Sequence, residues 1–250
     1  MMDPGLIVFV VAVLVLAGMV KGVIAMGMPT IGVGLLSIVM PPADAAALII
    51  LPSALTNVAQ LLAGPRLGPL VRRFWVLAAT VTAGTLLGGM WLGGLESRIA
   101  PAMLGCTLLL YGILGLRQLH FVTPASWEAW LSPVMGLASG LLTGTTGVTV
   151  MPVAPFLQSL SLERDDLIQA LGLVFTVATF ALAAALSGRG APFSDPRMVA
   201  ASVAALIPAF VGMEVGRRVR QRISPAAFKT WFFAGLALLG TYMVLRPILF

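Results

Sequence analysis

Charged residues are scarce in this chain of 250 residues: they make up 10% of it, whereas hydrophobic residues make up 59%. A soluble domain carries about a quarter charged residues, because its surface has to face water. The deficit excludes a water-soluble globular domain. The net charge of +6 does not indicate nucleic-acid binding, because the basic residues stand at the ends of apolar segments, where membrane orientation requires them. We therefore expect no nucleic-acid partner.

Cysteine and histidine are nearly absent, with one of each in the chain. Cys106 excludes an internal disulfide, and its apolar surroundings predict a small, buried, hydrophobic side chain. The lone His120 neither forms a catalytic triad nor completes a metal site. The chain also lacks the HExxH and GxxxxGKS motifs of metalloproteases and nucleotide-binding proteins. The sequence therefore predicts no enzyme, no metal and no cofactor.

Long apolar segments fill the chain from one end to the other. Each is long enough to cross about 30 Å of hydrocarbon, and runs such as 45–51 do not show the alternation of a β-barrel strand. The segments must then be helices, which satisfy their own backbone hydrogen bonds in lipid. The sequence predicts an all-α integral membrane protein that forms one membrane domain. About eight transmembrane segments are expected, at 5–26, 45–64, 74–94, 102–119, 129–160, 167–187, 198–216 and 226–249.

The residues 1–122 and 123–250 repeat one pattern. The matched positions lie 122 to 124 residues apart, from 18 and 140 (140 − 18 = 122) to 88 and 212 (212 − 88 = 124). They include Gly18, Gly22, Pro29, Ser53, Thr56 and Gly88 in the first half, and Gly140, Gly144, Pro152, Thr176, Thr179 and Gly212 in the second. We therefore predict two transmembrane repeats.

The first segment of each half is interrupted by glycine and proline. As one helix, the 36 residues of 5–40 would reach about 54 Å, too long for a single crossing, and 129–160 is broken in the same way. Paired breaks of this kind are typical of the substrate site of a transporter. Alternatively, the glycines serve only close helix packing. The proline that follows the glycines in both halves favours broken, re-entrant helices.

The basic residues test the topology. If each broken segment crossed once, the fourteen basic residues other than Lys21 would divide seven against seven. If each broken segment returns to its own side, they divide ten against four, which is a usable orientation signal. The ten are Arg66, Arg72, Arg73, Arg117, Arg164, Arg217, Arg218, Arg220, Arg222 and Lys229, and the four are Arg98, Arg189, Arg197 and Arg246. The second reading predicts inverted repeats with both termini outside the cell.

Together these features resemble the TauE/SafE (TSUP) family of sulfite and organosulfur-anion exporters. The resemblance covers essentially the whole chain and rests on its size, its repeat and two glycine-rich motifs, Gly18-x3-Gly22-x4-Gly27-Met28-Pro29 and Gly140-x3-Gly144-x2-Gly147-x4-Pro152. The second motif departs from the first by having Thr143 where Lys21 stands. The resemblance implies secondary export of sulfite, sulfoacetate or other organosulfonates across the bacterial inner membrane. An anion channel, an importer of thiosulfate or a carboxylate, and a non-transporting membrane subunit are alternatives.

Lys21 is the strongest single candidate for a substrate-binding residue. It is the only charged residue between Asp3 and Asp44, and a charge at membrane depth costs about 2.5–3.5 kcal/mol on insertion scales. Such a residue usually has a partner or a task, which favours a cation that receives the anion. Alternatively, Lys21 ends a span and its side chain snorkels to the interface.

Backbone and hydroxyl groups supply the other candidates. Helices that begin near Pro29 and Pro152 would direct free N–H groups at one central cavity. The side chains of Ser53, Thr56, Asn57 and Gln60 share one helix face, and Thr176 and Thr179 occupy the matching face in the second half. Threonines such as Thr149 either bind the anion or bond their own helix. The expected substrate-binding residues are Lys21, Gly22, Gly27, Pro29, Ser53, Thr56, Asn57, Gln60, Thr143, Gly144, Thr145, Thr146, Gly147 and Thr176.

The remaining acidic residues have structural interpretations. Asp44 and Asp166 are expected to cap helix N-termini, and Glu214 is expected to pair with Arg217 and Arg218. The expected partners are a small anion and membrane lipids. The sequence does not decide the oligomeric state, and a homodimer is one alternative.

Overall fold

The computed structural model describes residues 3–91, 94–97, 99–117, 122–188 and 195–249, and every regular element in these ranges is helical. Arg98, His120 and Arg189 lie outside the described residues. The first half contains α1 (Pro4–Ile24), α2 (Met28–Leu36), α3 (Pro42–Leu62), α4 (Leu67–Trp91), the short 3-10 helix η1 (Gly94–Glu96) and α5 (Ala100–Leu116). The second half contains α6 (Ala125–Thr146), α7 (Val153–Ser159), α8 (Arg164–Ser187), α9 (Pro196–Ala204), α10 (Leu206–Val219) and α11 (Pro225–Leu249).

Six described helical stretches are long and apolar enough to cross a membrane: Pro4–Ile24, Pro42–Leu62, Leu67–Met90, Arg164–Ser187, Pro196–Val219 and Ala226–Arg246. The expected segment 102–119 forms α5, a shorter apolar helix of 17 residues. The segment 129–160 forms α6 and α7, and 198–216 is divided between α9 and α10 at Ala205. Pro208 has no N–H to donate to a carbonyl one turn earlier, which accounts for this division.

Both glycine-rich segments break where the chain takes a left-handed conformation. Ala25 follows α1 at φ 61° and Gly147 follows α6 at φ 73°. The two residues lie 122 positions apart (147 − 25 = 122), and each N–H bonds a carbonyl four residues back, Lys21 O and Thr143 O, at 2.8 Å. After Gly27, at φ 96°, α2 folds back beside α1, so that a Cβ placed on Gly32 would lie 3.8 Å from that of Ala17. A side chain at Gly27 would meet the strain of a positive φ.

The first helix of each half packs against a helix of the other half, α1 against α10 and α6 against α4. On α1, a Cβ at Gly22 would stand 2.3 Å from the carbonyl oxygen of Met213 on α10. On α6, a Cβ at Gly144 would stand 2.3 Å from the carbonyl oxygen of Thr85 on α4. The bare sides of these two glycines face a neighbouring helix and permit close packing, and their role in substrate binding stays a prediction.

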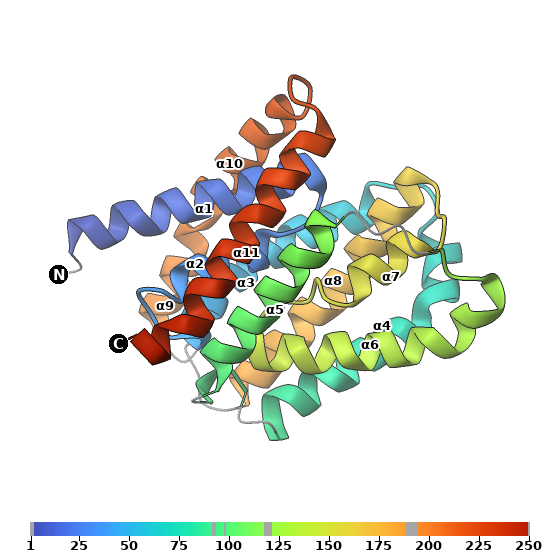
Figure 1. Cartoon of the computed structure of the whole chain (residues 1–250), viewed down its shortest axis with the longest axis horizontal. Coiled ribbons are helices and arrows are strands. Elements are labelled where there is room, and N and C mark those ends of the chain that lie inside the picture. Colours follow the sequence, from blue (N-terminus) through green and yellow to red (C-terminus); the bar gives the residue numbers. More distant parts are fainter. Residues whose placement is uncertain (1–2, 92–93, 98, 118–121, 189–194, 250) are drawn as a thin grey trace.

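The helices α3 and α8 pair with each other between the outer helices (Figure 1), and each buries a dozen or more residues. They approach closely at Gly172, where a Cβ would meet the backbone nitrogen of Leu61 at 2.7 Å. Side chains bind across the same contact, since Gln169 Nε2 donates to the carbonyls of Leu61 and Gly64 at 2.8 Å each. The two halves therefore also meet along α3 and α8.

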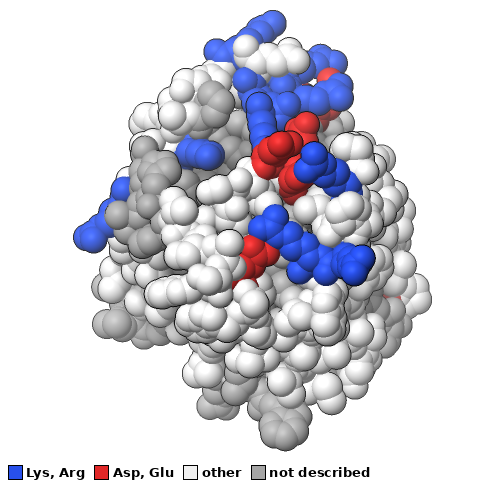
Figure 2. Space-filling view, turned by 90° about the vertical axis from the view of Figure 1, so that its right-hand side faces the viewer, with Lys and Arg blue, Asp and Glu red and all other residues white. Residues whose placement is uncertain are grey.

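One side of the molecule carries a group of charged side chains. The N- and C-termini lie at the left of Figure 1, and Figure 2 shows Lys, Arg, Asp and Glu gathered on the opposite, right-hand side. Among the described residues, ion pairs that join the halves include Arg66 with Asp166 at 3.1 Å and Arg73 with Glu128 at 2.7 Å.

Three smaller predictions are settled by the structure. Glu214 pairs with Arg217 at 2.8 Å and with Arg218 at 2.9 Å, so that prediction is confirmed. Asp44 and Asp166 are not N-caps: they stand in the first turns of α3 and α8, behind the N-cap residues Pro41 and Glu163. The prediction of a buried Cys106 is also wrong, because its side chain is exposed on α5.

The packing role of Gly22 can be tested with one methyl group. In Gly22→Ala the new Cβ cannot fit 2.3 Å from a backbone oxygen, so α1 and α10 must separate. We expect the free energy of unfolding to fall by about 1–3 kcal/mol, seen as a lower thermal unfolding temperature in detergent. The matched control is Gly235→Ala on α11, where a Cβ meets no atom within 4 Å. Equal unfolding temperatures for the two variants would contradict this assignment.

Candidate functional site

Lys21 is buried in the last turn of α1. Its side chain is 5% exposed, and it is the only charged residue in the core among those that the structure describes. Its Nζ donates a hydrogen bond to Oδ1 of Asn57 on α3. No described carboxylate forms an ion pair with it. The ammonium group therefore has a neutral partner only, and its charge is uncompensated.

Asn57 connects Lys21 to the second half of the chain. Its side chain is 1% exposed, and its Nδ2 donates to the carbonyl of Phe175 at 3.2 Å and to Oγ1 of Thr179 at 3.1 Å. Both acceptors lie on α8. A single chain of hydrogen bonds therefore runs from α1 through α3 to α8, across the contact between the two halves.

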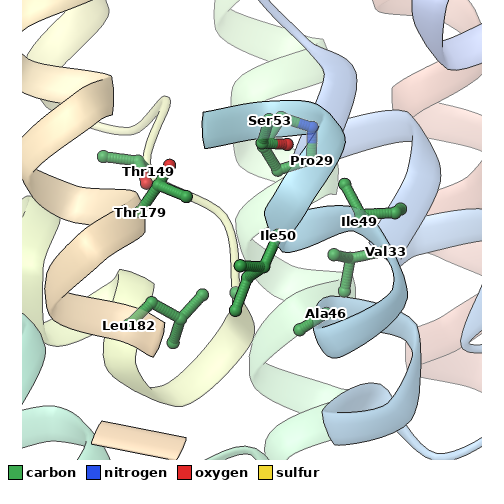
Figure 3. A pocket seen from close by; sticks show the side chains of 10 residues that line it. Pro29, Val33, Ala46, Ile49, Ile50, Ser53, Thr149, Thr179 and Leu182 are labelled. Carbon is green, nitrogen blue, oxygen red and sulfur yellow. The ribbon is translucent and has the colours of Figure 1, made fainter. Parts of the chain in front are cut away.

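A small pocket lies beside this chain of hydrogen bonds. Its lining residues are Lys21, Met26, Gly27, Pro29, Asn57, Thr149, Val150, Phe175 and Thr179. A second pocket adjoins it and shares Pro29, Thr149 and Thr179 with it (Figure 3); its other lining residues are Val33, Ala46, Ile49, Ile50, Ser53, Gly147 and Leu182. We call them the lysine pocket and the serine pocket. Each has space for about one water molecule.

Both breaks contribute to the pockets, but in different ways. The first break supplies Gly27, the N-cap of the nine-residue helix α2, together with Pro29 in its first turn. The first-turn N–H groups of a helix have no partner within the helix, and they carry the positive end of its dipole. The second break supplies the non-helical residues Gly147, Thr149 and Val150, whereas the start of α7 at Val153 lines neither pocket. Two helix starts were expected to converge on one cavity, but only the start of α2 lines these pockets.

Six of the fourteen predicted site residues line the two pockets: Lys21, Gly27, Pro29, Ser53, Asn57 and Gly147. The remaining eight do not line either pocket. Gly22 and Gly144 pack against neighbouring helices, and Gln60 donates to the carbonyl of Ile168 at 2.8 Å.

Five threonines outside the pockets are occupied by their own helices. Each hydroxyl donates to a carbonyl four residues earlier at 2.6–2.9 Å, because a hydroxyl in a membrane helix finds its nearest acceptor there. These threonines are Thr56, Thr143, Thr145, Thr146 and Thr176.

In the lysine pocket, three apolar lining residues could not be recognised from the sequence: Met26, Val150 and Phe175. Apolar residues are common throughout this chain, so neither their type nor their spacing marks them. Thr179 did carry a signal, since it matches Thr56 in the repeat (179 − 56 = 123).

Comparison with known proteins identifies the family. Residues 10–243 match the family model described as "Sulfite exporter TauE/SafE". The chain belongs to the TauE/SafE family. Searches of curated proteins and of solved structures returned no significant match. TauE/SafE proteins are membrane transporters and not enzymes. The chain is therefore a multi-pass membrane protein of a family that, in general terms, exports anions such as sulfite.

Proposed function

We propose that this TauE/SafE protein is a secondary exporter that binds sulfite, sulfoacetate or another organosulfonate in the lysine pocket. The observation that supports this most is the state of Lys21. Its ammonium group is buried, it is bonded to a neutral amide only, and it lines a pocket where the two halves meet. A buried charge is costly unless it is paired, and an anion in the lysine pocket would supply the missing negative charge.

The groups around the pocket suit an anion of this class. A desolvated sulfite or sulfonate needs a full positive charge, and a helix N-terminus supplies only about half of one. Lys21 provides the charge, the start of α2 adds backbone donors, and the Thr149 hydroxyl lies on the wall. On binding, the ammonium group would exchange the amide oxygen of Asn57 for an oxygen of the substrate.

Transport requires the pocket to widen. Space for about one water molecule does not hold sulfite, so we assign the described conformation to a closed, substrate-free state. The chain of hydrogen bonds from Lys21 through Asn57 to Thr179 crosses the contact between the halves. An anion that draws the ammonium group away from Asn57 loosens this contact, which couples binding to the movement of one half against the other.

We further propose inverted repeats with re-entrant first segments in the bacterial inner membrane. Three features support this topology: α2 folds back beside α1, α1 packs on α10 as α6 packs on α4, and both termini lie away from the charged side. The charged side would face the cytoplasm, in agreement with the excess of basic residues in its loops. Both termini would then be periplasmic.

Substitution of Lys21 tests the binding role. In Lys21→Ala we expect sulfite binding to purified protein to fall at least a hundredfold, because the only full charge in the pocket is gone. Membrane insertion should be unaffected, because removing a buried charge eases it. Lys21→Arg should keep part of the affinity, since the guanidinium is bulkier and directs its hydrogen bonds differently. Calorimetry measures the affinity, and Lys229→Ala, at an exposed lysine, is the control. Unchanged affinity in Lys21→Ala would refute the proposed site.

Cysteine labelling tests the topology. In a Cys106→Ser background, we would place one cysteine at Gly68, between α3 and the body of α4, or one after the last residue. We expect a membrane-impermeant maleimide to label the C-terminal cysteine in spheroplasts, and Gly68→Cys only after permeabilisation. If both positions react from the same side, the inverted topology is rejected.

A further inference from the structure

Ser53 has a buried hydroxyl group with nothing to bond. It lies on α3 one helical turn before Asn57, is 2% exposed, and its Oγ has no hydrogen-bond partner in the described part of the chain. Leaving a buried donor unpaired costs about 1–3 kcal/mol, and such groups in native proteins usually have an explanation. Ser53 lines the serine pocket, so an occupant of that pocket can supply the partner.

The other walls of the serine pocket define its chemistry. Thr149 faces it from the second half, and its hydroxyl forms no hydrogen bond with the described residues. Figure 3 shows Ser53 beside Pro29 on one side, and Thr149 beside Thr179 on the other. The remaining lining side chains are aliphatic, among them Val33, Ile49 and Leu182, and none of the lining residues is charged. The serine pocket therefore suits a neutral polar group on a short carbon chain, and a second anionic group would lack a counter-charge there.

We propose that the serine pocket is a second subsite, which binds an uncharged hydrogen-bonding group of the same substrate whose anionic group lies at Lys21. This inference rests on the proposed function, since it takes the lysine pocket as the anion site. The two pockets share three lining residues, and Ser53 and Asn57 are about 6 Å apart along α3 at 1.5 Å per residue. A sulfonate with a hydroxyl group two carbons away can reach both. The substrate class is thereby narrowed from sulfonates in general to short hydroxylated ones.

A matched pair of ligands tests the subsite. Ethanesulfonate and 2-hydroxyethanesulfonate differ only in one hydroxyl group, and calorimetry on the purified full-length protein gives the affinity for each. We expect the wild type to bind the hydroxylated ligand about five- to tenfold more tightly, the value of one hydrogen bond. In Ser53→Ala the preference should shrink to less than twofold, through weaker binding of the hydroxylated ligand alone.

The control is Ser139→Ala. Ser139 is also buried with an unpartnered hydroxyl, but it lines neither pocket, so its loss should leave both affinities unchanged. Equal binding of the two ligands by the wild type overturns the subsite, and so does a preference that persists in Ser53→Ala. If neither ligand binds while sulfite does, the subsite is wrong and the proposed function stands. If sulfite also fails to bind, or Lys21→Ala binds as well as the wild type, the proposed function itself is wrong.

Discussion

The hydrogen bond between the Lys21 ammonium and the Asn57 amide oxygen links the buried charge to the contact between the two halves. A charge at this depth must be satisfied, and the amide satisfies it without neutralising it. Asn57 also donates to α8, so the group that steadies the charge is also the group that ties the halves together. In the proposed mechanism, an incoming anion competes with Asn57 for the protons of the ammonium group, so that substrate binding and the movement of the halves depend on one interaction.

Close helix packing brings that interaction into place. Lys21 and Gly22 are neighbours on α1, and the bare side of Gly22 lies against the backbone of α10. With no side chain at Gly22, α1 lies close to α10, and the neighbouring Lys21 side chain reaches Asn57 on α3. The glycine-rich motif and the lysine therefore act together, the first by setting the distance between helices and the second by providing the charge.

The sequence predicted the class of protein and the two breaks, and it named both Lys21 and Asn57, which the structure brings into contact. These predictions rest on the free-energy cost of exposing a charged or amide side chain to lipid. That cost applies in any membrane fold, so such side chains point towards the protein interior. The individual roles of Gly22, Gly144 and the threonines could not be predicted in the same way. A glycine that leaves room for a ligand has the same spacing in the sequence as one that leaves room for a neighbouring helix. A threonine whose hydroxyl bonds a carbonyl of its own helix has the same spacing as one whose hydroxyl is free to bind a ligand.

The measurement that tests the central claim most directly is thermal unfolding in detergent, with and without sulfite, for the wild type, Lys21→Met, Asn57→Leu and the double variant. Loss of Asn57 alone leaves a buried charge unbonded and should destabilise the protein by about 1–3 kcal/mol, whereas Lys21→Met in the same chain should restore most of that loss. Sulfite should raise the unfolding temperature of the wild type and of Asn57→Leu, and of neither variant that lacks Lys21. The account would be contradicted if the stability losses of the two single variants added up in the double variant, and if sulfite raised the unfolding temperature of Lys21→Met as much as that of the wild type.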